Sequence, residues 1–167
     1  HMLVFGAERE LATLAQDPQR LIDGVKDAGG LSFLAHPYDP EAPTFRQDDL
    51  SWVDWDVKGY TGIELWNALS EFKSLLKGIL PAIYYAFVPD AVAHGPFEEV
   101  LSKWDELLNS GQRVVVVGGS DAHALEGNLG PLKKVLFPYE FHFRAVNTHI
   151  ITAEPFSGDA VTDRKIV

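Results

Sequence analysis

Four consecutive valines at positions 114–117 are the feature that most constrains the fold of this chain. A short β-branched run without a polar interruption is typical of a strand that is buried on both faces, as in a parallel sheet. The preceding stretch, 97–108, carries apolar residues at helical spacing, and Gly111 is placed to end that helix. The sequence therefore predicts a helix that leads directly into a buried strand.

The same alternation of apolar runs and amphipathic helical stretches occupies most of the chain. Strands are expected at residues 2–6, 31–35, 62–66, 114–117 and 148–151. Helices are expected at residues 18–28, 70–79, 81–88, 97–108 and 159–167, with one helical turn at 48–52. This order predicts an α/β fold with a parallel sheet. The length of 167 residues, with no repeat and no linker, predicts a single domain over residues 1–167.

Composition excludes several classes of protein. The chain has no Cys, which excludes disulfides, thiolate metal ligands and a cysteine nucleophile. Acidic residues outnumber basic ones 24 to 14, and the net charge of -10 argues against a nucleic-acid partner, because phosphate contacts need Lys and Arg. No apolar run approaches the roughly 20 residues of a membrane span, and no signal peptide is visible. We therefore expect a cytoplasmic protein without a membrane partner.

Polar side chains follow three of the predicted strands at the points where those strands end. They are His36 after 31–35, Glu64 and Asn67 at the end of 62–66, and Ser120, Asp121 and His123 after 114–117. Because the carboxyl ends of parallel strands meet at one edge of a sheet, these clusters predict an active site at that edge.

The first two ligand candidates are Asp121 and His123, which lie two residues apart. In an extended segment such residues project to the same side, so a carboxylate and an imidazole can converge on one cation. His36 adds a second neutral nitrogen, and this donor set suits Zn, Mn or Fe better than Ca or Mg. Three ligands leave a position for a water molecule, which the metal would activate as a nucleophile. The alternative interpretation makes Asp121 a turn cap and His123 a surface residue.

Four further residues are candidates for contacting the substrate or supporting the ligands. Glu64 is equally well interpreted as a ligand, base or partner of His36, and as a carboxylate satisfied by backbone N–H groups. Asn67 is a structural or substrate-orienting residue. Asp39 either faces the same pocket or serves the turn at Asp39-Pro40. Ser120 belongs to the same group through its place beside Asp121.

Three motifs together resemble the later half of a PHP domain, from the polymerase and histidinol phosphatase superfamily. They are Phe33-Leu34-Ala35-His36-Pro37, Gly62-Ile63-Glu64-Leu65-Trp66-Asn67 and Gly118-Gly119-Ser120-Asp121-Ala122-His123. The likeness spans about residues 3–123 and is closest to the stand-alone metal-dependent phosphoesterases of that superfamily. It implies a distorted (β/α)7, TIM-like barrel with two or three divalent metal ions at the carboxyl ends of its strands. This chain would be the C-terminal portion of that barrel, with the N-terminal strands missing.

The resemblance also implies a partial ligand set. His36, Asp121 and His123 match motif positions that bind metal in the family. The family's ligand Glu comes before the Ala-His-Pro motif, so Glu64 is not carried over as a ligand. The family's His-x-His motif, and the Asp, His and Glu that follow it, are not found in this sequence. His1 stands where the family has a ligand His before a strand, but His1-Met2 is also what a cloning junction leaves.

The leading functional prediction is hydrolysis of a small phosphate mono- or diester by a metal-activated water, with Asp121 and His123 as catalytic residues. Loss of part of the ligand set weakens metal binding, so the activity of this portion alone is left open. One alternative is a non-catalytic module that binds metal or anions in a regulatory role. Another is a metal-dependent amide or ester hydrolase of a different α/β-barrel family. Unpaired sheet edges predict either association with a second copy or only marginal stability.

Overall fold

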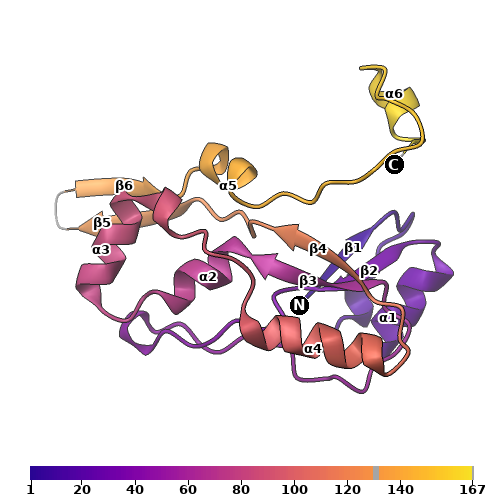
Figure 1. Cartoon of the computed structure of the whole chain (residues 1–167), viewed down its shortest axis with the longest axis horizontal. Helices are drawn as coiled ribbons and strands as arrows, with labels where there is room; N and C mark the ends of the chain where they lie inside the picture. Colours follow the sequence, from indigo (N-terminus) through magenta and orange to yellow (C-terminus); the bar gives the residue numbers. More distant parts are fainter. Residues whose placement is uncertain (130–131, 167) are drawn as a thin grey trace.

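A four-stranded sheet in the order β1-β2-β3-β4 forms the centre of the molecule (Figure 1). The computed structural model describes residues 1–129 and 132–166. The strands of the sheet are β1 (Met2–Phe5), β2 (Leu31–Leu34), β3 (Gly62–Asn67) and β4 (Val115–Gly119). The helices are α1 (Pro18–Asp27), α2 (Ala68–Ser74), α3 (Ile79–Phe87), α4 (Glu98–Asn109), α5 (Tyr139–Ala145) and α6 (Ala160–Asp163). The predicted α/β class is confirmed.

The sheet is parallel over three of its strands and antiparallel at β1. β2 pairs with β3, and β3 with β4, in parallel register. β1 runs antiparallel to β2, with Met2 opposite Leu34 and Phe5 opposite Leu31. The expectation of a wholly parallel sheet is therefore wrong for β1. The physical reason is that the chain leaves β1 at Phe5 and returns through α1 to Leu31 at the same edge, whereas a parallel pair requires a return to the opposite edge.

The main core lies between the sheet and the helices α1 and α4. Its fully or almost fully buried members come from both layers, namely Ile22, Leu34, Val57, Tyr60, Ile63, Val100, Leu107 and Val114. α1 and α4 are amphipathic, and each packs its apolar face against one face of the sheet. A smaller cluster of Phe72, Val92 and Phe137 joins α2 to the segment before α5. The core thus holds β2, β3 and β4 rigidly beneath the site that follows.

A hairpin and a short helix follow β4 in the segment before residue 148, where no element was predicted. β5 (Leu125–Leu129) and β6 (Leu132–Leu136) form an antiparallel pair separate from the main sheet, and α5 follows β6. In Figure 1 this pair lies next to α3, at the end of the sheet where β3 and β4 finish. The chain therefore returns over the carboxyl edge after β4.

Two predicted elements are wrong. Residues 148–151 form no strand. Thr148 Oγ1 only exchanges hydrogen bonds with the backbone N–H and C=O of Gly118, both at 2.8 Å, while Ile150 and Ile151 are exposed. The predicted helical turn at 48–52 is non-helical, and a short 3-10 turn occurs instead at Pro43–Phe45. The first error arises because residues 148–151 have the apolar content of a strand but no partner strand. The second arises because the turn residues at 48–52 lack a cap that would start a helix.

The ends of the helices also differ from expectation. α2 begins two residues earlier than predicted because the Asn67 side chain caps it, accepting from the Ser70 N–H at 2.8 Å. α6 is shorter than the predicted 159–167, of which residue 167 lies outside the described residues. None of the helices in the described part of the chain is long and apolar enough to cross a membrane.

Candidate functional site

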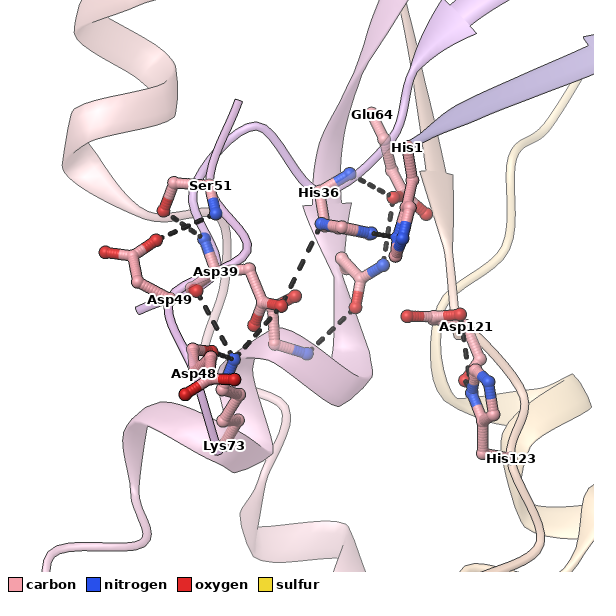
Figure 2. A network of polar contacts seen from close by, with 12 residues as sticks. His1, His36, Asp39, Asp48, Asp49, Ser51, Glu64, Lys73, Asp121 and His123 are labelled. Carbon is pink, nitrogen blue, oxygen red and sulfur yellow. Dashed lines mark hydrogen bonds and ion pairs between the residues drawn. The ribbon is translucent and has the colours of Figure 1, made fainter. Parts of the chain in front are cut away.

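Side chains from four strands meet at the carboxyl edge of the sheet. β2, β3 and β4 end there, so His36 and Asp121, which follow β2 and β4, lie near one another. Asn67, the last residue of β3, reaches the same place through Glu64. The antiparallel β1 begins at the same edge, which places His1 beside His36 (Figure 2). The edge at which the sequence predicts an active site therefore carries side chains from separate parts of the chain.

His1 and His36 contact each other directly. Nδ1 of His1 lies 2.7 Å from Nε2 of His36, and the rings meet edge to face with centroids 4.8 Å apart. At that distance one nitrogen donates a proton and the other accepts it. Burial lowers the pKa of His36, against the raising effect of the Asp39 carboxylate, so the ring is neutral near pH 7. A neutral imidazole is the form that binds metal ions.

Glu64 lies behind His36 and holds its backbone. Its Oε2 accepts hydrogen bonds from the His36 N–H at 2.7 Å and from Asn67 Nδ2 at 2.9 Å. A Cβ added at Gly119 would lie 2.5 Å from Glu64 Oε1, so β4 approaches the carboxylate closely. Burial raises the pKa of Glu64, because this residue is only 3% exposed. Glu64 thus positions His36 from within the sheet, and Asn67 links it to the start of α2.

Two candidate ligands have left-handed backbone conformations. φ is 30° at His36 and 48° at Asp121, a region that favours glycine. The hydrogen bond from the His36 N–H to Glu64 supports the first of these. Such conformations persist only where surrounding structure determines them, and they cluster at functional sites.

His123 follows Asp121 and turns back towards it. His123 Nδ1 donates to the Asp121 backbone O at 2.7 Å and lies 3.4 Å from Asp121 Oδ1. In the neutral form of the ring, this bond places the proton on Nδ1 and leaves Nε2 with a lone pair. In Figure 2 the Asp121 carboxylate points towards the His1–His36 pair, with His123 beside it. Ser120, the remaining candidate of this cluster, is half-buried at the end of β4.

Asp39 and Lys73 form a buried ion pair next to His36. Lys73 Nζ lies 3.2 Å from Asp39 Oδ2 and donates to the backbone O of Asp48 at 2.5 Å and of Asp39 at 3.4 Å. Asp39 Oδ2 is also 3.9 Å from His36 Nδ1. His36 Nδ1 and Asp39 Oδ1 are buried atoms without hydrogen-bond partners among the described residues. Asp39 therefore supports both the ligand candidate and the loop after it.

A cavity of about 610 Å³ opens in front of these residues. The predicted site residues on its wall are His1, His36, Asp39, Asp121 and His123. Glu64 and Asn67 are buried behind His36. The structure thus separates the candidates into a group that faces the cavity and a group that supports it.

Two residues of the site were not predicted. Lys73 carries an ion pair with Asp39, although lysine on an amphipathic helix usually faces solvent. His142 of α5 is 2% exposed, and its Nε2 donates to the backbone O of His123 at 3.1 Å. A histidine within the aromatic-rich segment 137–143 is the only sequence signal for this contact, and it is equally typical of a core position.

The donor chemistry of the edge fits a divalent metal ion of the borderline class. His1, His36 and His123 offer imidazole nitrogens and Asp121 offers a carboxylate, the set preferred by Zn, Mn or Fe. Within the described residues, no three such side chains lie close enough together to form a ready metal-binding group. The unpartnered Nδ1 of His36 beside Asp39 matches the carboxylate–histidine pairing that orients metal ligands.

Comparison of the chain with protein-family models, with curated proteins and with solved structures gives no match. The geometry of the site and the three motifs therefore carry the functional argument.

Proposed function

We propose that this chain is part of a PHP-type phosphoesterase that hydrolyses phosphate mono- or diesters with the help of divalent metal ions. The observation that carries the proposal is the cavity at the carboxyl edge, where His36, Asp121 and His123 gather from the ends of β2 and β4. In parallel α/β sheets this edge is where catalytic side chains collect.

Four residues would hold the metal. His36 and Asp121 are the central pair, His123 offers Nε2, and His1 adds a further nitrogen beside His36. Zn, Mn or Fe bound there would lower the pKa of a water molecule towards neutrality and supply a nucleophile. Glu64 and Asp39 keep His36 in place, through its backbone N–H and beside its Nδ1 respectively.

The reaction consumes one water molecule. The water oxygen forms a new bond to phosphorus, the bond from phosphorus to the ester oxygen breaks, and the departing alcohol gains a proton. The proton that the departing alcohol gains comes from the attacking water. Asp121 and His123 are the catalytic residues of this proposal because both line the cavity and would hold the metal that activates that water.

The barrel architecture belongs to the same proposal. β1 pairs only with β2, and β4 only with β3, among the described strands. A barrel would continue from these edges, and so would a pairing between two copies of the chain, because open edges attract further strands.

The test is to measure bound metal and phosphoesterase activity in this chain and, where the native protein extends further upstream, in that longer protein. We expect Mn, Fe or Zn to copurify and hydrolysis of a phosphate ester that EDTA abolishes. Stoichiometric metal without phosphate-ester hydrolysis, on a panel that also holds amides and carboxylic esters, would overturn the proposal. Hydrolysis of amides or carboxylic esters instead would identify a metal-dependent hydrolase of another class. Absence of any hydrolysis would identify a binding module.

The variant His123→Ala tests the ligand assignment. It should lower metal content while circular dichroism shows an intact fold, because the His123 side chain is more than half exposed. His149→Ala, an exposed histidine outside the cavity, is the matched control. Unchanged metal content in the His123 variant would remove His123 from the site.

A further inference from the structure

The cavity has two chemically different ends. The polar end lies at the sheet edge and carries His1, His36, Asp121 and His123. The larger part of the wall is apolar and lies beyond that edge, where Figure 1 places α2, α3 and the hairpin. Its members are Phe45, Leu50, Leu69, Phe72, Leu76, Ala82 and Leu136. A ligand that binds the histidines with one group must therefore place the rest of its length against the apolar side chains of this wall.

The apolar wall comes from segments that the rest of the fold holds in place. Phe72 belongs to the small core cluster with Phe137, and Leu69 and Leu76 pack against it. Phe45 and Leu50 lie on the loop that the buried Lys73 ties down through the backbone O of Asp48. Both loop residues are partly exposed, 36% for Phe45 and 47% for Leu50. Contacts with the rest of the fold thus hold the apolar wall in place, and its exposed side is accessible to a ligand.

Among the side chains of this wall that the structure describes, no free lysine or arginine is present to bind a second charged group. Lys73 is the one lysine or arginine among the described residues that line the cavity. Its three protons point to Asp39 Oδ2 and to the backbone O atoms of Asp48 and Asp39. A lysine ammonium has three donors, so none is left for a ligand. Among the described side chains of the wall, a polyphosphate or a nucleotide would therefore find no free lysine or arginine for its further charges.

We propose that the substrates of this site are phosphate monoesters of apolar alcohols, with the phosphoryl group at the histidines and the hydrocarbon along the apolar wall. The inference rests on the proposed phosphoesterase function. Burial of hydrocarbon against Leu50, Leu69 and Phe72 supplies the binding free energy. The products are the alcohol, which takes up one proton, and inorganic phosphate, which keeps the oxygen from water.

The experiment uses n-alkyl phosphates from ethyl through butyl to hexyl, assayed with Mn²⁺. All three have the same kind of leaving group, so only the length of hydrocarbon changes. Each added CH₂ that enters the cavity should raise kcat/KM by about three- to fourfold. A flat series overturns the inference and leaves the phosphoesterase proposal standing.

Leu50→Asp tests the wall itself. A charge at this position should lower kcat/KM for hexyl phosphate by about tenfold or more, and by a clearly larger factor than for ethyl phosphate, so the gain with chain length should disappear. Leu108→Asp on α4 is the matched control, since Leu108 is 42% exposed and lies away from the cavity. If both variants lose hexyl phosphate activity equally, Leu50 does not line the substrate site and the inference fails.

Binding of alkyl phosphonates separates the inference from the activity on which it rests. Phosphonates cannot be hydrolysed, so calorimetry reports affinity with Mn²⁺ and again with EDTA. Hexylphosphonate should bind more tightly than ethylphosphonate, and Leu50→Asp should remove that difference. Length-dependent binding without any hydrolysis keeps the ligand class and overturns the phosphoesterase; absence of both overturns the two proposals together.

Discussion

The Glu64 carboxylate accepts a hydrogen bond from the backbone N–H of His36 at 2.7 Å, so a residue of β3 fixes the backbone that follows β2. The same oxygen accepts from Asn67 Nδ2, and the other oxygen faces β4 at Gly119. One buried carboxylate therefore links three strand ends. This arrangement explains why the three sequence motifs, one at the end of each strand, form one structural unit.

Removing the acceptor at Glu64 should be far more harmful than removing its charge. Glu64→Leu leaves two buried donors unsatisfied, and we expect a loss of about 3 kcal/mol in the free energy of unfolding. Glu64→Gln keeps an acceptor oxygen and should lose less than about 1.5 kcal/mol. Urea-induced unfolding followed by circular dichroism measures both. Equal losses would mean that the hydrogen bonds to His36 and Asn67 do not matter for stability.

Gly119 is needed because Glu64 occupies the space of a Cβ. Gly119→Ala should destabilise the protein by about 1–3 kcal/mol, since the new methyl group collides with Glu64 Oε1. In a Glu64→Ala background the same substitution should cost much less. The double-mutant cycle therefore gives a coupling energy, and additive effects would refute the contact.

The ion pair of Lys73 and Asp39 should matter for stability because both residues are buried. Lys73→Met leaves the Asp39 carboxylate without its cation, with an expected loss of about 3–5 kcal/mol in urea unfolding. The exposed Lys77 is a matched control, and Lys77→Met should change stability by less than about 0.5 kcal/mol. A small effect at Lys73 would show that the loop after His36 is held by other contacts.

His142 should support the proposed metal site through the backbone of His123. His142→Phe removes the donor to the His123 carbonyl and should weaken metal affinity by about 10–100-fold. His142→Gln keeps a donor and should restore most of that loss. Amide hydrogen exchange at residues 122–124 gives a readout that does not depend on metal, and it should accelerate in the Phe variant only. If Gln and Phe behave alike, the hydrogen bond is not what positions His123.

Tyr60 carries a buried hydroxyl without a hydrogen-bond partner among the described residues. Tyr60→Phe should therefore stabilise the protein by about 1 kcal/mol, raising Tm by about 2–4 °C. Burial also raises the pKa of Tyr60 in the folded state. The unfolded chain releases this proton at lower pH than the folded one, so stability falls as pH rises above about 10, and less so in the variant. Tyr84→Phe, at an exposed position, should show neither effect.

The strands and longer helices were predictable because their apolar periodicity is strong. The valines at 114–117 and the stripes of α1 and α4 indicate a strand and two helices locally. The core takes up Val114 and the partly buried Val116, but Val115 is 43% exposed, so the expectation of a strand buried on both faces is wrong. The direction of β1 was not predictable, because pairing with β2 depends on where α1 returns the chain. The segment 148–151 has strand composition, but nothing in its own sequence reports the lack of a partner strand.

The candidate site was predictable at the strand ends and not beyond them. His36 follows β2, and Asp121 and His123 follow β4, so their place at one edge of the sheet follows from the parallel pairing of β2, β3 and β4. The contacts of Lys73 and His142 depend on how α2 and α5 pack, and composition alone assigns lysine to solvent and histidine to either environment. Glu64 needed the structure to decide among its interpretations, and its hydrogen bonds favour support of His36.

The left-handed backbone at His36 and Asp121 sets stability and chemistry against each other. Glycine at either position would relax the backbone and favour the folded state, yet it would delete a side chain from the cavity. A population of sequences selected only for thermal tolerance should therefore drift to glycine at these two positions. One selected for turnover should retain histidine and aspartate there, so the two pressures leave opposite records at the same sites.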